Sequence, residues 1–258
     1  MITAGLDIGT GYVKAVISDN GRISGYACRK CSEITETVNS VLDAALVNAN
    51  IKKRNISRIA ATGYGGGYYK KASFALNESA CIAKAVSTLN KDIKMVIDVG
   101  ALFIKVIMIR DNGMVDDAYV NEPCASGSGK FIELVAEALD VPLEKISDYA
   151  QSSTQPYNIS SSCAVFAESE VISRINCGTK TADIFAGVLD SIALRVLSLT
   201  GKAGKLPAGG IALTGGVSRI PAFYGMIEKH IGQRVSVLTF DAQMIPSYGA
   251  SLLAQMGK

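Results

Sequence analysis

Two short segments of the sequence place an aspartate, a glycine and a lysine at the same spacing, from Asp7 to Lys14 and from Asp98 to Lys105. Glycines in such a turn let backbone N–H groups approach an anion closely, and the lysine adds positive charge. An aspartate at a strand end suits Mg²⁺ or its waters. One glycine turn alone is more often an ordinary hairpin, but the repetition favours a pair of phosphate-binding turns. The residues predicted to contact phosphate are Gly9, Thr10, Gly11, Lys14, Gly100 and Lys105, and Asp7 and Asp98 are the predicted catalytic carboxylates.

Two cysteines, Cys124 and Cys163, each come just before a predicted amphipathic helix, over residues 130–139 and 165–175. A helix N-terminus lowers the pKa of a thiol and stabilises the thiolate, and hence a negatively charged iron–sulfur cluster. An ordinary buried thiol is the alternative for each cysteine. The remaining cysteines are predicted to be structural: Cys28 and Cys31, which lack the second pair of a metal site, and Cys81 and Cys177, which are expected to pack helices.

The elements that must position these residues form a repeated pattern. Each acidic hairpin is followed by an Asp-Asn-Gly turn, a third strand over 22–27 or 114–119, and a helix over 33–48 or 130–139. Two β-β-β-α units in one chain imply an internal duplication and predict an α/β fold of two lobes. We expect one lobe over 1–91 and the other over 92–258, the last helix being free to pack back on the first lobe. Nucleotides tend to bind between such halves.

A third glycine turn, at Gly215 and Gly216, follows a strand predicted over 210–213 and precedes a helix beginning near Pro221, with Ser218 as the expected cap. Two acidic hairpins and this late turn together are similar to the sugar kinase, Hsp70 and actin superfamily, a two-lobed, ribonuclease H-like fold. That resemblance implies that the hairpins clamp phosphates and that Gly215 and Gly216 contact adenosine.

The composition narrows the classes of function. A chain of 258 residues with 48% hydrophobic residues is long enough for two lobes with their own cores, and its net charge of +3 is scattered, which argues against nucleic acid. The apolar stretch 95–109 is interrupted by Asp98 and Lys105, so no membrane span is predicted. The first ten residues do not resemble a signal peptide, so we expect a cytoplasmic protein with reduced cysteines.

The sequences around the two helix-start cysteines, Cys-Ala-Ser-Gly-Ser-Gly and Ser-Ser-Cys-Ala-Val-Phe-Ala-Glu-Ser-Glu-Val, resemble the activator ATPases of 2-hydroxyacyl-CoA dehydratases and their benzoyl-CoA reductase relatives. The resemblance covers nearly the whole chain, including 61–65, 77–81 and 183–187. It implies ATP or ADP with Mg²⁺, and one 4Fe-4S cluster held by Cys124 and Cys163 of both subunits of a homodimer. It also implies ferredoxin or flavodoxin as electron donor and an iron–sulfur dehydratase or reductase as partner. A 4Fe-4S cluster usually needs four thiolates, and this chain offers two well-placed ones, so two chains related by a two-fold axis would supply the full set.

The second hairpin departs from that family. Its usual Asp-x-Gly-Gly-Gln-Asp reads Asp-Val-Gly-Ala-Leu-Phe over 98–103, so Phe103 stands where a second aspartate could contact metal or orient water. One interpretation is that the substitution is neutral. The other is that ATP hydrolysis is slow or altered, or that the chain belongs to a divergent branch with a different electron acceptor. The histidine that usually follows the Glu-x-x-Cys stretch is replaced by Ile82, and His230 is expected at the surface.

Two alternatives share the predicted fold. A small-molecule kinase would need a base near the terminal phosphate, which 101–103 do not offer. A nucleotide-gated binding or scaffold protein tolerates poor hydrolysis but leaves Cys124 and Cys163 unexplained.

Overall fold

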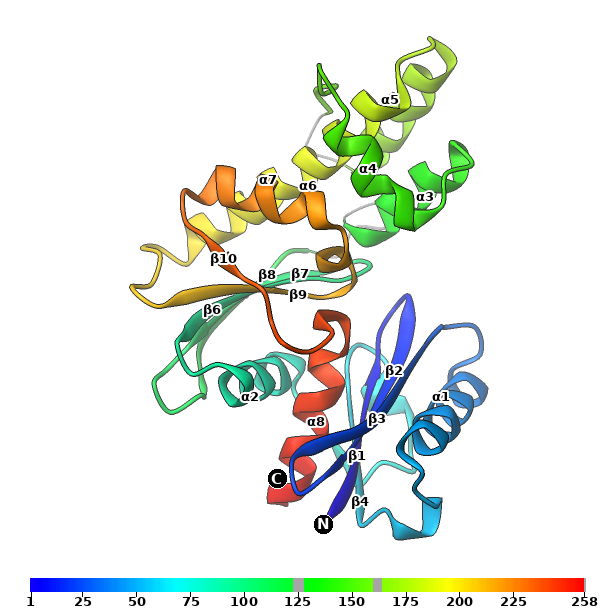
Figure 1. The fold of residues 1–258 in the computed structure, drawn as a ribbon, viewed down its shortest axis with the longest axis vertical. Helices are drawn as coiled ribbons and strands as arrows, with labels where there is room; N and C mark the ends of the chain where they lie inside the picture. The colour runs from blue at the N-terminus through cyan, green and yellow to red at the C-terminus, as the bar shows by residue number, and fades with distance from the viewer. Residues whose placement is uncertain (123–127, 160–163, 258) are drawn as a thin grey trace. The chain divides into compact units, whose positions relative to one another are not determined.

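The structure is a computed structural model that describes residues 1–122, 128–159 and 164–257 (Figure 1). Cys124 and Cys163, the predicted cluster ligands, lie outside the described residues.

Two five-stranded sheets repeat one strand order. The first sheet has the order β3-β2-β1-β4-β5 and the second, counted from β8, has the order β8-β7-β6-β9-β10. The first sheet consists of β1 (Ile2–Ile8), β2 (Tyr12–Asp19), β3 (Arg22–Lys30), β4 (Arg58–Thr62) and β5 (Phe74–Ala75). The second consists of β6 (Ile93–Val99), β7 (Ile104–Ile109), β8 (Val115–Val120), β9 (Gly210–Thr214) and β10 (Val235–Ser236). The equivalent positions of the strands confirm the predicted duplication.

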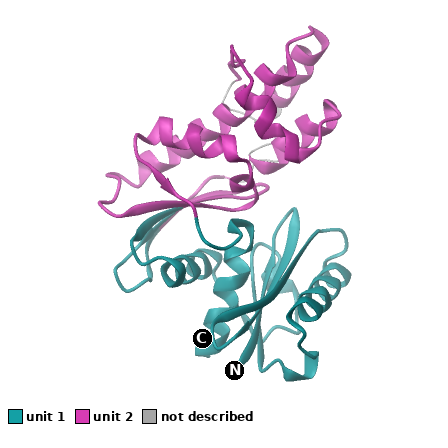
Figure 2. Cartoon of the chain, in the orientation of Figure 1, with its two compact units in different colours: residues 1–96, 107–117, 238–258 teal, residues 97–106, 118–237 magenta. Residues whose placement is uncertain are grey.

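The chain divides into two compact units (Figure 2). Unit 1 comprises residues 1–96, 107–117 and 238–258, and unit 2 comprises residues 97–106 and 118–237. Strands β6, β7 and β8 therefore each contribute residues to both units. The lobes expected over 1–91 and 92–258 stay a prediction.

In unit 1, helices cover both faces of the first sheet (Figure 1). Helix α1 (Ile34–Ala49) buries Val38, Val41 and Leu42 against the alternate residues of β1 and β2 that face it. The opposite face is covered by α8 (Ile245–Met256), where Thr3 of β1 donates its hydroxyl to the carbonyl of Ser251 over 2.9 Å. Helix α2 (Glu78–Leu89) packs beside α8 through a small apolar cluster of Ala60, Cys81, Ala250 and Ala254.

The helices of unit 2 are α3 (Gly129–Ala138), α4 (Ile146–Gln151), α5 (Ala164–Asn176), α6 (Thr181–Lys202) and α7 (Pro221–Ile231). Phe131, Phe185 and Phe223, from three of these helices, are fully buried. Within the described residues, α6 is the one helix long and apolar enough to cross a membrane, but 67% of its most apolar window is buried inside the protein. Such burial is typical of a core helix.

Five short 3-10 helices complete the described secondary structure. They are η1 (Lys53–Asn55), η2 (Gly66–Tyr68), η3 (Leu143–Lys145), η4 (Gly216–Arg219) and η5 (Ala242–Met244).

Candidate phosphate-binding site

The first turn, between β1 and β2, is closed by one backbone hydrogen bond, from Gly9 N to Tyr12 O over 3.0 Å. Within the described part of the chain, the N–H groups of Thr10 and Gly11 donate to no protein acceptor. The side chain of Thr10 is exposed. Two adjacent backbone donors and one hydroxyl are thus available to an anion at the tip of this turn.

Asp7 lies at the end of β1, opposite Lys14 on β2, and is only 2% exposed. Its Oδ2 accepts a hydrogen bond from Lys14 Nζ over 2.8 Å. Its Oδ1 is buried and has no hydrogen-bond partner among the described residues. Leaving a buried acceptor unsatisfied costs about 1–3 kcal/mol, and more for a charged group, so this oxygen is suited to a donor from outside the chain. Water or hydrated Mg²⁺ fits that requirement, because Mg²⁺ binds through one or two carboxylates and keeps several waters.

Gly63, just after β4, provides the space for that oxygen. A Cβ atom at Gly63 would overlap Asp7 Oδ1, and the backbone angle φ of +81° is one that glycine adopts without strain. Sequence reasoning missed this residue.

Lys14 remains charged although its side chain is only 13% exposed. Burial is the largest single influence and lowers its pKa, but the negative charge of Asp7 and the hydrogen bond to it act in the opposite direction. Cys28 and Glu78 also raise the pKa of Lys14, by smaller amounts than Asp7 does. The net result is a raised pKa. The ammonium group therefore balances Asp7 at neutral pH, and Cys28 lies opposite Lys14 in the register of β2 and β3.

The second turn has the same local geometry. Gly100 N donates to Phe103 O over 2.9 Å, as Gly9 N does to Tyr12 O. Within the described residues, the N–H groups of Ala101 and Leu102 donate to no protein acceptor. The predicted equivalence of the two hairpins is therefore present in the backbone, despite the changed side chains.

Asp98 differs from Asp7 in its partners. Its Oδ1 accepts a hydrogen bond from Thr214 Oγ1 over 2.7 Å, and its Oδ2 lies 3.3 Å from Lys105 Nζ. Both oxygens thus have donors within the protein, whereas Asp7 Oδ1 has none among the described residues. The ammonium of Lys105 also lies 5.8 Å from the centre of the Phe103 ring.

Gly215, at the start of the third turn, lies against the end of β6. A Cβ atom there would overlap the Val99 carbonyl, and φ is +86°. Thr214, the last residue of β9, and Gly215 correspond to Thr62, the last residue of β4, and Gly63, because β9 and β4 hold equivalent places in the two sheets. A Thr-Gly pair at the end of an apolar strand in each half is the sequence signal that reveals this correspondence.

Two expectations about polar residues near α7 were wrong. Ser218 does not cap α7, because its hydroxyl donates to the carbonyl of Gly215 over 2.6 Å within the preceding turn. His230 is not a simple surface residue, because its Nε2 lies 2.7 Å from Asp190 Oδ1 and its side chain is 17% exposed. Gly216, predicted to contact adenosine, begins η4.

The described cysteines differ in environment. Cys81 is buried in α2, as expected, and burial raises the pKa of its thiol to about 12. Cys177 is exposed, so the expectation that it packs a helix was wrong. Cys28 and Cys31 are both half-buried. Among the described residues, no three histidine, cysteine, aspartate or glutamate side chains are grouped to hold a metal ion.

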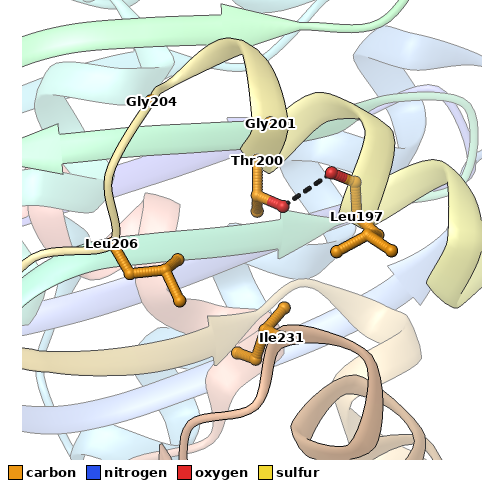
Figure 3. Close-up of a pocket in the computed structure, with 6 residues that line it drawn as sticks. All are labelled: Leu197, Thr200, Gly201, Gly204, Leu206 and Ile231. Carbon is orange, nitrogen blue, oxygen red and sulfur yellow. Dashed lines mark hydrogen bonds between the residues drawn. The ribbon is translucent and has the colours of Figure 1, made fainter.

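A cavity of about 150 Å³ in unit 2 has none of these turn residues in its lining (Figure 3). It is lined by Leu197, Thr200, Gly201, Gly204, Leu206 and Ile231. The hydroxyl of Thr200 donates to the carbonyl of Leu197 over 2.8 Å. No charged side chain lines this cavity, so it lacks the groups that bind phosphate.

Residues 4–254 match the BadF/BadG/BcrA/BcrD ATPase family. The (R)-2-hydroxyglutaryl-CoA dehydratase activating ATPase of Acidaminococcus fermentans is 32% identical over 254 residues, which cover 98% of this chain and 96% of that protein. The solved structure of the activator of the 2-hydroxyisocaproyl-CoA dehydratase from Clostridium difficile with bound ADPNP has a TM-score of 0.92 and 31% identity, and the match covers 100% of this chain and 95% of that chain. A ROK family glucokinase from Streptomyces griseus has a TM-score of 0.63 at 14% identity, covers 100% of both chains and agrees in fold alone. The fold class expected from the sequence is therefore confirmed.

Proposed function

Because the chain belongs to the BadF/BadG/BcrA/BcrD ATPase family, we propose that it is a cytoplasmic, ATP-dependent activator that delivers an electron to a partner iron–sulfur enzyme. The partner is a dehydratase or reductase component that acts on an acyl-CoA. The observation that carries the nucleotide half of the proposal is the unsatisfied oxygen of Asp7 at the end of β1, together with the available amides of Thr10 and Gly11 in the turn that follows that strand. A buried acceptor for hydrated metal beside donors for phosphate is the combination that Mg²⁺-ATP requires.

The roles proposed for individual residues follow from these contacts. Asp7 holds Mg²⁺ or the attacking water, and the amides of the two hairpin turns bind phosphate oxygens together with Lys14 and Lys105. ATP and water give ADP and phosphate. Asp98 is proposed as the second carboxylate that contacts Mg²⁺ or its waters, and hydrogen bonds from Thr214 and Lys105 hold it in position. The residues proposed to contact phosphate are Gly9, Thr10, Gly11, Lys14, Gly100 and Lys105, and those proposed to contact adenosine are Gly215 and Gly216.

Cys124 and Cys163 are proposed as cluster ligands. They precede helices α3 and α5, whose first described residues are Gly129 and Ala164. Thiolates are the usual ligands of a 4Fe-4S cluster, and two per chain require a second copy. Such a cluster, when bound, would take up one electron from ferredoxin or flavodoxin and release it to the partner enzyme.

A homodimer follows from the number of thiolates, because two per chain require a second copy of the chain to complete a set of four. Helix α5 also carries two exposed apolar side chains, Phe166 and Ile172, which are 70% and 49% exposed.

Anaerobic reconstitution tests the electron-transfer half. We expect about four irons per dimer, lost in Cys124→Ser and in Cys163→Ser but kept in Cys177→Ser, which changes an exposed thiol near the end of α5. Iron-free wild-type protein after careful reconstitution would exclude the cluster.

Calorimetric titration with Mg²⁺-ADP tests the nucleotide half separately. We expect binding by wild-type protein and weaker binding by Asp7→Asn. Failure of the wild-type protein to bind ADP or ATP would exclude the ATPase proposal whatever the iron content.

A further inference from the structure

The N-terminus of helix α3 is capped by the second phosphate turn. The first N–H groups of a helix have no acceptor within the helix and need one from elsewhere. In α3, Gly129 N donates to Gly100 O over 3.0 Å and Lys130 N donates to Ala101 O over 2.9 Å. The N-cap residue, Ser128, makes no side-chain bond to its own helix. The helix therefore depends on carbonyl groups of the turn.

Ser128 strengthens the same junction from its side chain. It is fully buried, and its Oγ lies 3.0 Å from both Gly100 O and Ala101 O. A hydroxyl has one proton, so the two carbonyls share it. The next residue, Gly129, lies too close to the turn for a larger side chain. A Cβ atom at this position would lie 2.9 Å from Gly100 O and 3.3 Å from Val217 Cγ2.

The peptide units whose carbonyls hold α3 are also the ones whose N–H groups have no protein acceptor among the described residues. A trans peptide is planar, and its C=O and N–H point in opposite directions. Gly100 O and Ala101 N belong to one such unit, and Ala101 O and Leu102 N belong to the next. The two carbonyls bind the start of α3, and within the described residues the two amides donate to no protein acceptor. An anion that orients these amides must also orient the carbonyls that cap α3.

The first turn has no such link in its described contacts. Its Gly11 O accepts a hydrogen bond from Cys31 N over 2.8 Å, and Cys31 follows strand β3 rather than beginning a helix. The two halves have turns of the same backbone geometry, but the turns bind different segments. The second turn binds the start of helix α3, and the first binds the residue after strand β3. Attachment to a helix N-terminus is thus a feature of the second half.

We propose that Ser128 is a positioning residue that transmits the nucleotide state of the second turn to helix α3. Phosphate bound at the amides of Ala101 and Leu102 fixes two peptide planes, and the hydroxyl of Ser128 makes α3 follow them. Loss of the terminal phosphate releases the planes and loosens the first turn of the helix. The inference rests on the proposed binding of nucleotide and deepens it.

Hydrogen exchange of the full chain tests the inference, with peptides covering α3 compared without nucleotide, with Mg²⁺-ADP and with Mg²⁺-ADPNP. In the wild-type protein, we expect ADPNP to slow exchange in the first turn of α3 by about tenfold. In Ser128→Ala, we expect the slowing to fall to less than about twofold, while the dissociation constant for ADPNP changes by less than about threefold.

Two further variants make the result specific. Gly129→Ala pushes a methyl group toward Gly100 O and should also reduce the nucleotide-dependent slowing. Ser191→Ala is the matched control, because Ser191 is equally buried but donates to Val188 O within α6. It should keep the wild-type response.

The outcomes separate the two proposals. If wild-type protein binds ADPNP but Ser128→Ala keeps the full slowing of exchange, or if wild-type α3 does not respond, the transmission role is wrong and nucleotide binding stands. If wild-type protein binds no nucleotide, the proposed function itself fails.

Discussion

Removing the hydrogen bond from Thr214 to Asp98 measures how much this bond contributes to the stability of the second half. Thr214 and Asp98 are 0% and 2% exposed, and their oxygens are 2.7 Å apart. Valine matches threonine in shape, so Thr214→Val removes the donor without opening a cavity. A buried hydrogen bond to a charged group contributes about 1.5–3 kcal/mol, so we expect the variant to lose about 2 kcal/mol of unfolding free energy.

The equivalent threonine of the first half is the control. Thr62 is 1% exposed, but its hydroxyl donates over 2.9 Å to the neutral carbonyl of Leu76 rather than to Asp7. Thr62→Val should therefore cost only about 1 kcal/mol. Urea unfolding followed by circular dichroism gives both values. Hydrogen exchange of β4 and β9 gives the local loss if the two units unfold separately. Equal destabilisation by the two substitutions would refute the claim that the hydrogen bond from Thr214 to the charged Asp98 contributes more to stability than the bond from Thr62 to a neutral carbonyl.

Three other predictions concern the buried charges and thiols. Asp7→Asn should weaken the Mg²⁺-dependent part of ADP binding at least about tenfold more than Asp98→Asn, as measured by calorimetry at several Mg²⁺ concentrations; equal losses would show that the carboxylates are equivalent. Because the pKa of Lys14 is raised above its ordinary 10.5, its contribution to stability is complete below about that pH and is lost as pH rises through the folded pKa. The unfolding free energy of wild-type protein should therefore fall more steeply at high pH than that of Lys14→Met, and parallel curves would contradict this. Iodoacetamide at pH 8 should label exposed Cys177 but leave Cys81, whose thiol pKa is about 12, unlabelled until urea unfolds the chain. Mass spectrometry of the labelled peptides decides, and equal labelling rates would show that Cys81 is not protected.

Local pattern was sufficient for the elements that carry the site. The equal spacing from Asp7 to Lys14 and from Asp98 to Lys105 predicted two equivalent hairpins, and in the structure the aspartate and the lysine of each hairpin form an ion pair. This succeeds because side chains on adjacent antiparallel strands meet at positions set by the turn length. The helices over 33–48 and 130–139 were found for a similar reason, since apolar periodicity is a local property.

Local pattern failed where a polar side chain had several acceptors within reach. Ser218 satisfies the pattern of a helix cap, yet the carbonyl of Gly215 in its own turn takes its proton. His230 lies in a polar stretch, yet Asp190 on the neighbouring helix α6 is 2.7 Å from its ring. Charge and polarity in one segment do not reveal which partner the fold places beside it.

The sequence by itself determined that the chain is duplicated, that each half begins with an acidic hairpin, and which family its cysteine motifs resemble. Only the tertiary structure decided that the two halves are unequal. Asp98 meets Thr214 across a separation of 116 residues, and Ser128 meets Gly100 across 28, whereas one oxygen of Asp7 has no partner among the described residues. These contacts depend on which strand and which helix end come together. No periodicity within one segment encodes that choice, because it is made by the packing of segments distant in the chain.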